Sequence, residues 1–322
     1  MKKKVAVVCG GYSGESVVSM RSAQMIMNNI DRSHYDPYKI VITEAEWYAE
    51  TEQGNTPINK NNFSIPTASG EITFDGVFMI IHGTPGENGI LQGYFELLGI
   101  PTTTGDTLNM ALTFNKKMTT RLLGTYGYNV AKSITIKRTD SYSIQGIISR
   151  VGLPCFVKPN CGGSSIGTSR VNALEDLHKA IDTALKEDNQ IIIEEFIEGT
   201  EVTCGVIKWK GKITALPITE IVSQKEFFDF EAKYQGQSEE ITPARIDQEI
   251  YKRVQQISEE IYLSLDCRGM IRVDYIIRNR DIFIIEVNTT PGFSEASIIP
   301  QQAGVQGISK TELISTVISS CF

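Results

Sequence analysis

Two carboxylates and an amide near the C-terminal end of the chain could hold a divalent cation. Asp274 lies in the apolar run RVDYII, and Glu286 and Asn288 lie in IIEVN, with a turn at 278–281 between the two runs. If the runs pair about that turn, Asp274 comes close to Glu286, and the two-residue period of a strand places Glu286 and Asn288 on one face. Burying two carboxylates without a cation is unfavourable, whereas such oxygen ligands suit Mg²⁺ or Mn²⁺. The pattern predicts a metal-triphosphate site; the alternative is a solvated strand face with its carboxylates outward.

A glycine- and serine-rich stretch, residues 159–171, could cradle phosphate. Its sequence is PNCGGSSIGTSRV, and Lys158 ends the strand-like run before it. Glycines let the backbone approach an anion, and successive N–H groups with two hydroxyls could surround phosphate oxygens. The loop lacks the GxxxxGK[ST] spacing, so an ordinary hairpin turn remains the alternative. Lys116 and Lys233 are each compatible with a surface lysine and gain interest only beside the acidic cluster.

Four further residues could contact an amino acid or a developing charge. Glu15 stands at a helix start, where a carboxylate could capture an ammonium or simply cap the helix. His82 ends a buried strand and is either a substrate contact or a hydrogen-bonded structural histidine. Arg272 shares the strand face of Asp274 and could neutralise an anion. The backbone N–H of Gly292 could face an oxyanion, although a Pro-Gly turn explains this glycine equally.

The elements that would position these residues form an α/β pattern that becomes α+β in the C-terminal part. The run KKKVAVVCGG followed by a helix at 19–29 predicts a βα start, and the polar stretch 49–70 reads as connecting structure. A single helix is predicted at about 108–123. We expect three domains and a lid, with these ranges: 1–104, 105–193, 194–322, and the lid at 222–242.

Composition restricts the classes of function. The 322 residues allow two or three domains, and a net charge of −7 argues against a general nucleic-acid-binding surface. Three histidines without HExxH spacing argue against a zinc enzyme, and no run approaches the roughly 18 apolar residues of a membrane span. Six scattered cysteines and the lack of a cleavable leader predict a cytoplasmic protein.

An ordered set of motifs resembles the ATP-grasp superfamily and, within it, the D-alanine:D-alanine ligase family. The motifs are GGYSGESVVS, IIHGTPGENGILQGYFELLGIPTTTG, NKKMTT, FVKPNCGGSSIG, IIIEEFIEG, FFDFEAKY, ITPA, RVDYII and EVNTTPGFSEASIIP. They cover nearly the whole chain. The resemblance implies an ATP-grasp fold, in which an N-terminal parallel α/β domain precedes two α+β domains that sandwich ATP. It also implies ATP-dependent joining of two D-alanines through an acyl phosphate, for peptidoglycan precursor synthesis, by a homodimer.

The resemblance further implies which residues bind the nucleotide and the metal. The implied nucleotide-binding positions are Lys116, Lys158, Ser164, Ser165, Glu194, Glu195, Phe196, Ile197, Glu201 and Lys233. The first two lysines would contact the phosphates, the serine loop would close over them, the stretch 194–197 would face adenine, and Glu201 would hold the ribose. Asp274, Glu286 and Asn288 would bind two Mg²⁺ or Mn²⁺ ions.

The amino-acid positions also follow from the resemblance. The implied positions for substrates and reacting groups are Glu15, His82, Ser164, Lys233, Tyr234, Arg272, Gly292, Ser297 and Ile298. Glu15 would receive the ammonium of the first D-alanine with His82 nearby, and Arg272 and Gly292 would stabilise the oxyanion. The positions Lys233 and Ser297 would lie near the transferred phosphate and the second carboxylate.

Departures from the family pattern and competing functions remain. Cys161–Gly162 and Glu195 replace an Arg-Glu pair and a lysine that are common in relatives, which puts fine nucleotide contacts in doubt. Tyr234, expected to bond with Ser164 and Glu15, favours an amine acceptor over D-lactate. The alternatives are a D-alanine:D-lactate or other carboxylate-amine ligase, a nicotinamide dehydrogenase that uses GGYSGE, and a nucleotide-binding regulator without catalysis.

Overall fold

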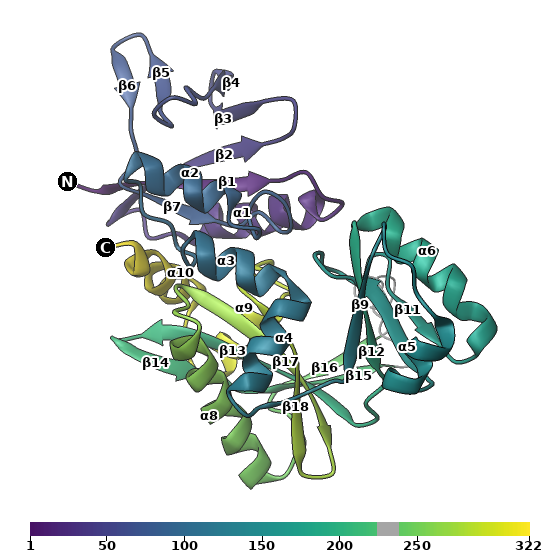
Figure 1. Ribbon diagram of the computed structural model, residues 1–322. Helices are drawn as coiled ribbons and strands as arrows, with labels where there is room; N and C mark the ends of the chain where they lie inside the picture. The colour runs from purple at the N-terminus through teal and green to yellow at the C-terminus, as the bar shows by residue number, and fades with distance from the viewer. Residues whose placement is uncertain (224–237) are drawn as a thin grey trace.

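The computed structural model describes residues 1–223 and 238–322, and Figure 1 shows how their elements are arranged. Within these residues the strands form three main sheets and a separate β5–β6 ribbon. The N-terminal sheet, the central sheet at residues 133–195 and the C-terminal sheet lie around a common middle region (Figure 1). None of the described helices has the length and apolar character that a membrane crossing requires.

The N-terminal sheet has the strand order β4-β3-β2-β1-β7. The elements in this part are β1 (Lys3–Gly10), α1 (Ser16–Asn29), β2 (Tyr35–Ile42), β3 (Trp47–Thr51), β4 (Gly54–Pro57), β5 (Ile65–Thr67), β6 (Gly70–Ile72), β7 (Gly76–Met79) and α2 (Ile90–Leu98). β1 runs parallel to β2 and β7, which confirms the predicted βα start. The continuous apolar run of β1 is buried, as expected for a strand covered on both faces.

The prediction that residues 49–70 are connecting structure is wrong. This stretch contains β4, β5 and parts of β3 and β6, with β3 antiparallel to both β2 and β4. β4 and β5 are short and mostly exposed, so their side chains do not show the apolar alternation by which a half-buried strand is recognised.

The predicted helix at 108–123 is two helices, α3 (Thr107–Phe114) and α4 (Lys116–Thr125). Asn115 separates them in an extended conformation, and its side chain accepts a hydrogen bond of 3.0 Å from the N–H of Met118. Asparagine is a favoured N-cap because its side-chain oxygen satisfies a free N–H of the first turn. The break places Lys116 at the first position of α4 instead of in the middle of a helix.

The central sheet is antiparallel, with the order β11-β10-β12-β9. Its elements are β9 (Ser133–Lys137), α5 (Ile144–Val151), β10 (Cys155–Pro159), β11 (Ser169–Val171), a 3₁₀ helix (Leu174–Asp176), α6 (Leu177–Glu187) and β12 (Gln190–Glu195). α5 and α6 bury their apolar faces against this sheet in one cluster. The glycine- and serine-rich loop connects β10 to β11, as predicted.

The C-terminal sheet carries the predicted hairpin. Its order is β16-β15-β13-β17-β18-β8, with β14 paired to β13. The elements are β8 (Asn129–Val130), β13 (Thr200–Trp209), β14 (Lys212–Ala215), β15 (Thr219–Ser223), β16 (Ser238–Ile241), α8 (Gln248–Ser264), β17 (Met270–Arg278), β18 (Asp281–Asn288), α9 (Ile298–Val305), α10 (Lys310–Ile318) and a 3₁₀ helix (Ser319–Cys321). β17 and β18 pair antiparallel with Asp274 opposite Glu286, which confirms that the two carboxylates lie near each other; an irregularity between Asp274 and Tyr275 shifts the register by one residue.

The division into 1–104, 105–193 and 194–322 stays a prediction. The strands differ from it at two places: β12 belongs to the central sheet although it continues to Glu195, and β8, before residue 193, pairs with β18. The central part of the predicted lid, residues 224–237, lies outside the described residues.

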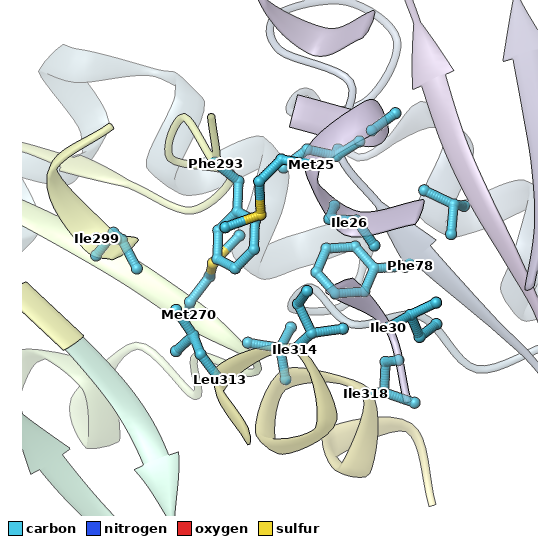
Figure 2. Packing of buried hydrophobic residues seen from close by; sticks show 14 of the residues in the cluster. Met25, Ile26, Ile30, Phe78, Met270, Phe293, Ile299, Leu313, Ile314 and Ile318 are labelled. Carbon is cyan, nitrogen blue, oxygen red and sulfur yellow. The ribbon is translucent and has the colours of Figure 1, made fainter. Parts of the chain in front are cut away.

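One apolar cluster joins the N-terminal sheet to the C-terminal elements. Figure 2 shows Met25, Ile26 and Ile30 beside Phe78 of β7, facing Phe293 and α10. The rings of Phe78 and Phe293 lie 6.0 Å apart between centroids. This packing holds the loops that follow β1 and β7 against the end of the β17–β18 hairpin, where the candidate site lies.

Candidate active site

The hairpin presents a charged face above an apolar one. Arg272 and Asp274 are partly exposed, whereas the alternating residues Ile271 and Val273 are fully buried. Both oxygens of Asp274 accept from Arg272, from Nε and from Nη2, each at 2.8 Å. Asp274 therefore lies in a two-pronged ion pair with its strand neighbour.

The same carboxylate collects further donors from adjacent strands. The hydroxyl of Thr203 on β13 donates to Asp274 at 2.5 Å, and Asn288 Nδ2 donates at 3.1 Å. Glu286 lies across the hairpin from Asp274, with its Oε2 3.3 Å from Nζ of Lys116. The sequence predicted that these groups converge, but it did not predict that protein cations neutralise both carboxylates.

The donor set on the hairpin fits magnesium or manganese. It offers two carboxylates and an amide oxygen on one strand face, which are hard ligands of the kind Mg²⁺ prefers. Among the described residues no three His, Cys, Asp or Glu side chains form a cluster suited to a metal ion. Such a cation would take its remaining ligands from phosphate oxygens and water, as is usual for Mg²⁺.

Two partly buried lysines, Lys116 of α4 and Lys158 of β10, face carboxylates. Lys116 Nζ donates to the carbonyl of Gly162 at 2.6 Å. Burial acts to lower the pKa of Lys116, but Glu286 and other nearby carboxylates outweigh it and raise that pKa above its ordinary value. Lys158 Nζ lies 2.6 Å from Oε2 of Glu194. Lys116 is thus held between Glu286 and the glycine- and serine-rich loop, and Lys158 is paired with Glu194.

The glycine- and serine-rich loop reaches the N-terminal part of the chain. The backbone of Ser164 and Ser165 has φ of 51° and 57°, a left-handed conformation that is uncommon for residues other than glycine. The hydroxyl of Ser164 donates to Oε1 of Glu15. A Cβ atom on Gly163 would lie 2.9 Å from both carboxylate oxygens of Glu15, so glycine is what allows this close approach. Glu15 makes no side-chain capping bond to α1, which removes the alternative that it is only a helix cap.

His82 is buried beside this contact. Its Nδ1 lies 2.8 Å from the carbonyl oxygen of Thr290, so Nδ1 carries the proton and donates. Its Nε2 has no hydrogen-bond partner among the described residues. Burial lowers the pKa of His82, which keeps the ring neutral and leaves Nε2 as an acceptor. A buried acceptor of this kind suits an ammonium ligand.

Two cavities meet at the charged face of the hairpin. The first, of about 340 Å³, is lined by polar and apolar atoms alike, and its polar residues include Glu15, His82, Arg272 and Ser297. The second, of about 490 Å³, has apolar walls that include Phe196. The residues common to both include Lys116, Ser164, Glu201, Asp274 and Glu286. Both volumes lie in the range of small-molecule sites, roughly 300 to 1,000 Å³.

Two family models match this chain. The D-ala D-ala ligase N-terminus matches residues 4–105, and the D-ala D-ala ligase C-terminus matches residues 122–319. The chain belongs to the D-alanine–D-alanine ligase family. Curated relatives with the name D-alanine–D-alanine ligase include those of Christiangramia forsetii, 46% identical over 99% of this chain and 98% of the relative, and of Porphyromonas gingivalis strain W83, with the same identity and coverages.

Solved structures agree with this assignment. The VanG D-Ala:D-Ser ligase from Enterococcus faecalis is 34% identical, with a TM-score of 0.89 and full coverage of both chains. The D-alanine–D-alanine ligase from Bacillus anthracis complexed with ATP is 27% identical, with a TM-score of 0.80, over 99% of this chain and 97% of that one. The predicted family, the ATP-grasp fold and the ligase class are confirmed, and ATP-dependent ligation is confirmed as the reaction of the family.

The ligase brings the predicted site residues together. Within the described part of the chain, every residue predicted from the sequence to act in the site lines one cavity or both. The predicted residues that line only the first cavity are Glu15, His82, Arg272, Asn288, Gly292, Ser297 and Ile298. Those of the second alone are Lys158, Ser165, Glu194, Glu195, Phe196 and Ile197. Lys233 and Tyr234 lie outside the described residues.

Sequence reasoning missed Glu87. This residue lies in the loop HGTPGENG, which the sequence marked only as a site wall, and it lines the first cavity. Its Oε2 accepts from the N–H of Gly83 at 2.6 Å. Burial, assisted by the negative charge of Glu15, raises the pKa of Glu87 to about 8. The sequence marked this loop because it follows a buried strand. Nothing in the sequence indicated that the glutamate within it would be desolvated.

Glu87→Gln is expected to stabilise the ligase increasingly as the pH rises. The folded-state pKa of Glu87 is above its unfolded value, so its favourable contribution is complete below about pH 4.5 and is lost as the pH rises through about 8. Glutamine keeps the acceptor oxygen for Gly83 and cannot ionise. Thermal unfolding at about pH 5.5 and about pH 9 should show a stability difference between variant and wild type that widens with pH, by at most about 1.4 kcal/mol per pH unit.

The control for this comparison is Glu52→Gln, because Glu52 is exposed on the turn between β3 and β4. Its stability difference from wild type should stay constant over the same pH range. A constant difference for Glu87→Gln would mean that Glu87 is ionised in the folded chain at neutral pH.

Proposed function

We propose that this ligase joins two D-alanine molecules to D-alanyl-D-alanine while ATP is converted to ADP and phosphate, through an acyl-phosphate intermediate. The observation that carries the proposal is that two cavities meet at Lys116, Asp274 and Glu286. Two lysines, two carboxylates and a glycine-rich loop at that junction suit a triphosphate whose end group points at an amino-acid carboxylate.

The second cavity is the proposed nucleotide site. Adenine would lie against Phe196 and Ile197, where the ring of Phe196 is already covered by the Arg170 guanidinium at 4.6 Å from its centroid. Lys116 and Lys158 would contact the phosphates. Each lysine ammonium has three donors, so it could donate to phosphate oxygens while it keeps a hydrogen bond to its present carboxylate partner.

The first cavity is the proposed amino-acid site. The ammonium of the first D-alanine would donate to Glu15 and to Nε2 of His82, the acceptor that is buried without a partner in the described structure. Ser164, bonded to Glu15, would close the phosphate loop over this substrate. The carboxylate of the second D-alanine would lie at Ser297 and Ile298, where α9 begins and its free N–H groups favour an anion.

The carboxylate of the first D-alanine must be activated before an amine can attack it, because an oxide ion is too basic to act as the leaving group. The first D-alanine carboxylate attacks the γ-phosphorus, ADP leaves, and the acyl phosphate forms. The amine of the second D-alanine, once deprotonated, attacks the acyl carbon. Phosphate then leaves with the oxygen that came from the carboxylate of the first D-alanine. Arg272 and the N–H of Gly292 would stabilise the oxyanion between these events. Asp274, Glu286 and Asn288 would hold Mg²⁺ or Mn²⁺, which supplies charge neutralisation for the phosphates when bound.

The identity of the second substrate, which accepts the activated D-alanine, distinguishes the proposed function from its alternatives. A D-alanine:D-lactate or other carboxylate-amine ligase would use the same nucleotide residues, and a structure with 34% identity carries the name D-Ala:D-Ser ligase. A homodimer and a cytoplasmic location also stay predictions.

The test is ADP release with Mg²⁺ over a panel of D- and L-amino acids, with products identified by mass spectrometry. We expect ADP release with D-alanine alone and D-alanyl-D-alanine as the product. Failure of D-alanine to increase ADP release, or turnover that is equal with L-alanine, would contradict the proposal. Reduction of a nicotinamide cofactor would favour the dehydrogenase alternative.

A further inference from the structure

Glu240 brings to the first cavity a carboxylate that the proposed reaction does not use. It lies on β16 opposite Ile221 of β15, and Ile221 lies opposite Glu201 of β13. Residues paired across strands share a face of the sheet. All three line the first cavity, so Glu240 points to the side of the sheet that carries Arg272 and Asp274.

The neighbours of Glu240 belong to the proposed acceptor site. Gln301 Nε2 lies 3.4 Å from Oε2 of Glu240. Gln301 is in the first turn of α9, and its N–H bonds to the carbonyl of Ser297 at 3.3 Å. Burial raises the pKa of Glu240, while the positive charge of Arg272 acts to lower it. The carboxylate is thus partly desolvated between the start of α9 and the proposed oxyanion group.

The distance between α9 and the sheet is fixed by a buried glutamine. Oε1 of Gln302 accepts from the N–H of Gly205 at 3.0 Å, and its Nε2 donates to the carbonyl of Thr203 and to the hydroxyl of Thr219, each at 3.0 Å. All of its hydrogen-bonding capacity faces β13 and β15. Glu240 and the start of α9 therefore face the cavity as two fixed groups of opposite electrostatic character.

This arrangement matches the charge pattern of an amino acid. A free N-terminal helix end favours a carboxylate, whereas a carboxylate side chain favours an ammonium. We infer that Glu240 is a specificity-determining residue of the acceptor site, which accepts a hydrogen bond from the ammonium of the second amino acid. A hydroxy acid such as D-lactate has a neutral hydroxyl in place of the ammonium, so it can donate to Glu240 only a hydrogen bond without a positive charge, which offsets the repulsion between the two carboxylates less well. The inference rests on the proposed function.

The test is a competition between acceptors. Wild type, Glu240→Gln and the control Glu239→Gln are incubated with ATP, Mg²⁺, D-alanine and an excess of D-lactate, and the amide and ester products are counted by mass spectrometry. Glu239 is exposed and neighbours Glu240 on the same strand, so it tests the loss of a charge without the loss of a cavity contact. We expect the ratio of amide to ester to fall at least tenfold in Glu240→Gln and to stay unchanged in Glu239→Gln.

Two further measurements separate recognition from structural damage. Glu240→Gln should raise KM for the second D-alanine while KM for the first changes little, and Glu240→Asp, which keeps the charge, should retain most of the preference for amine. A product ratio unchanged in Glu240→Gln, or lost equally in Glu240→Asp and Glu239→Gln, would overturn the inference. A wild-type chain that releases no ADP with D-alanine would instead contradict the proposed function on which it rests.

Discussion

Glu286→Gln is expected to abolish ADP release by this ligase while the chain stays folded. Glu286 faces Asp274 across the hairpin and lies 3.3 Å from Lys116, at the junction of the two cavities. Glutamine has almost the same shape but no charge, so it would hold neither a divalent cation nor the lysine. Changes even to residues behind a metal ligand reduce metal affinity or activity by about 10- to 100-fold, so the loss of Glu286, which we propose as a direct ligand, should reduce activity more than 100-fold.

The measurement is ADP release against Mg²⁺ concentration, with thermal unfolding as the test of folding. Asp281→Asn serves as the control, because Asp281 lies exposed at the turn of the same hairpin. Asp281→Asn should match wild type in both assays. Full activity of Glu286→Gln would remove the metal assignment, since no step would then depend on that carboxylate.

Arg272→Lys is expected to reduce kcat by about 100- to 1,000-fold, the usual effect of losing one oxyanion donor, because we propose that Arg272 is such a donor. Arg272 binds both oxygens of Asp274 from two nitrogens at 2.8 Å. Lysine keeps the charge, but its single ammonium cannot bind both carboxylate oxygens in this planar way while it also faces the cavity. The variant should therefore fold and bind ATP, yet stabilise the oxyanion poorly.

The appropriate comparison is Arg280→Lys, because Arg280 is exposed near the hairpin turn and forms a surface ion pair with Glu249. Single-turnover ADP formation and steady-state product formation should be measured together. If Arg272 acts on the oxyanion, the second amino-acid step slows more than ADP formation does. Equal slowing of both would assign Arg272 to the organisation of Asp274 instead.

The parts of the site that could be predicted from the sequence depend on local geometry. The pairing of β17 with β18 follows from a short turn between two apolar runs, so the proximity of Asp274 to Glu286 was predictable. Their direct opposition was not predictable, because it depends on an irregularity between Asp274 and Tyr275 that shifts the register by one residue. The glycine- and serine-rich loop was likewise recognisable by composition. The positions carried over from the family resemblance line the two cavities because they follow the same fold.

Other features depend on contacts between distant segments or on single side chains. One capping residue, Asn115, divides a helix whose apolar pattern is continuous. The ion pair of Arg272 with Asp274 depends on side-chain conformations that no pattern specifies. Glu240 faces the cavity because β16 pairs with β15 in one register; a shift of one residue would turn Glu239 inward instead.

The apolar cluster of Figure 2 means that a cut in the backbone would not separate the two ends of this enzyme. The family model of the N-terminus stops at residue 105, but α1 and β7 bury Met25, Ile26 and Phe78 against residues from beyond position 260. A fragment of residues 1–105 would expose that surface to water and should aggregate. Proteolysis between α2 and α3 should leave both pieces bound to each other, so that two co-expressed fragments reassemble where neither folds well by itself.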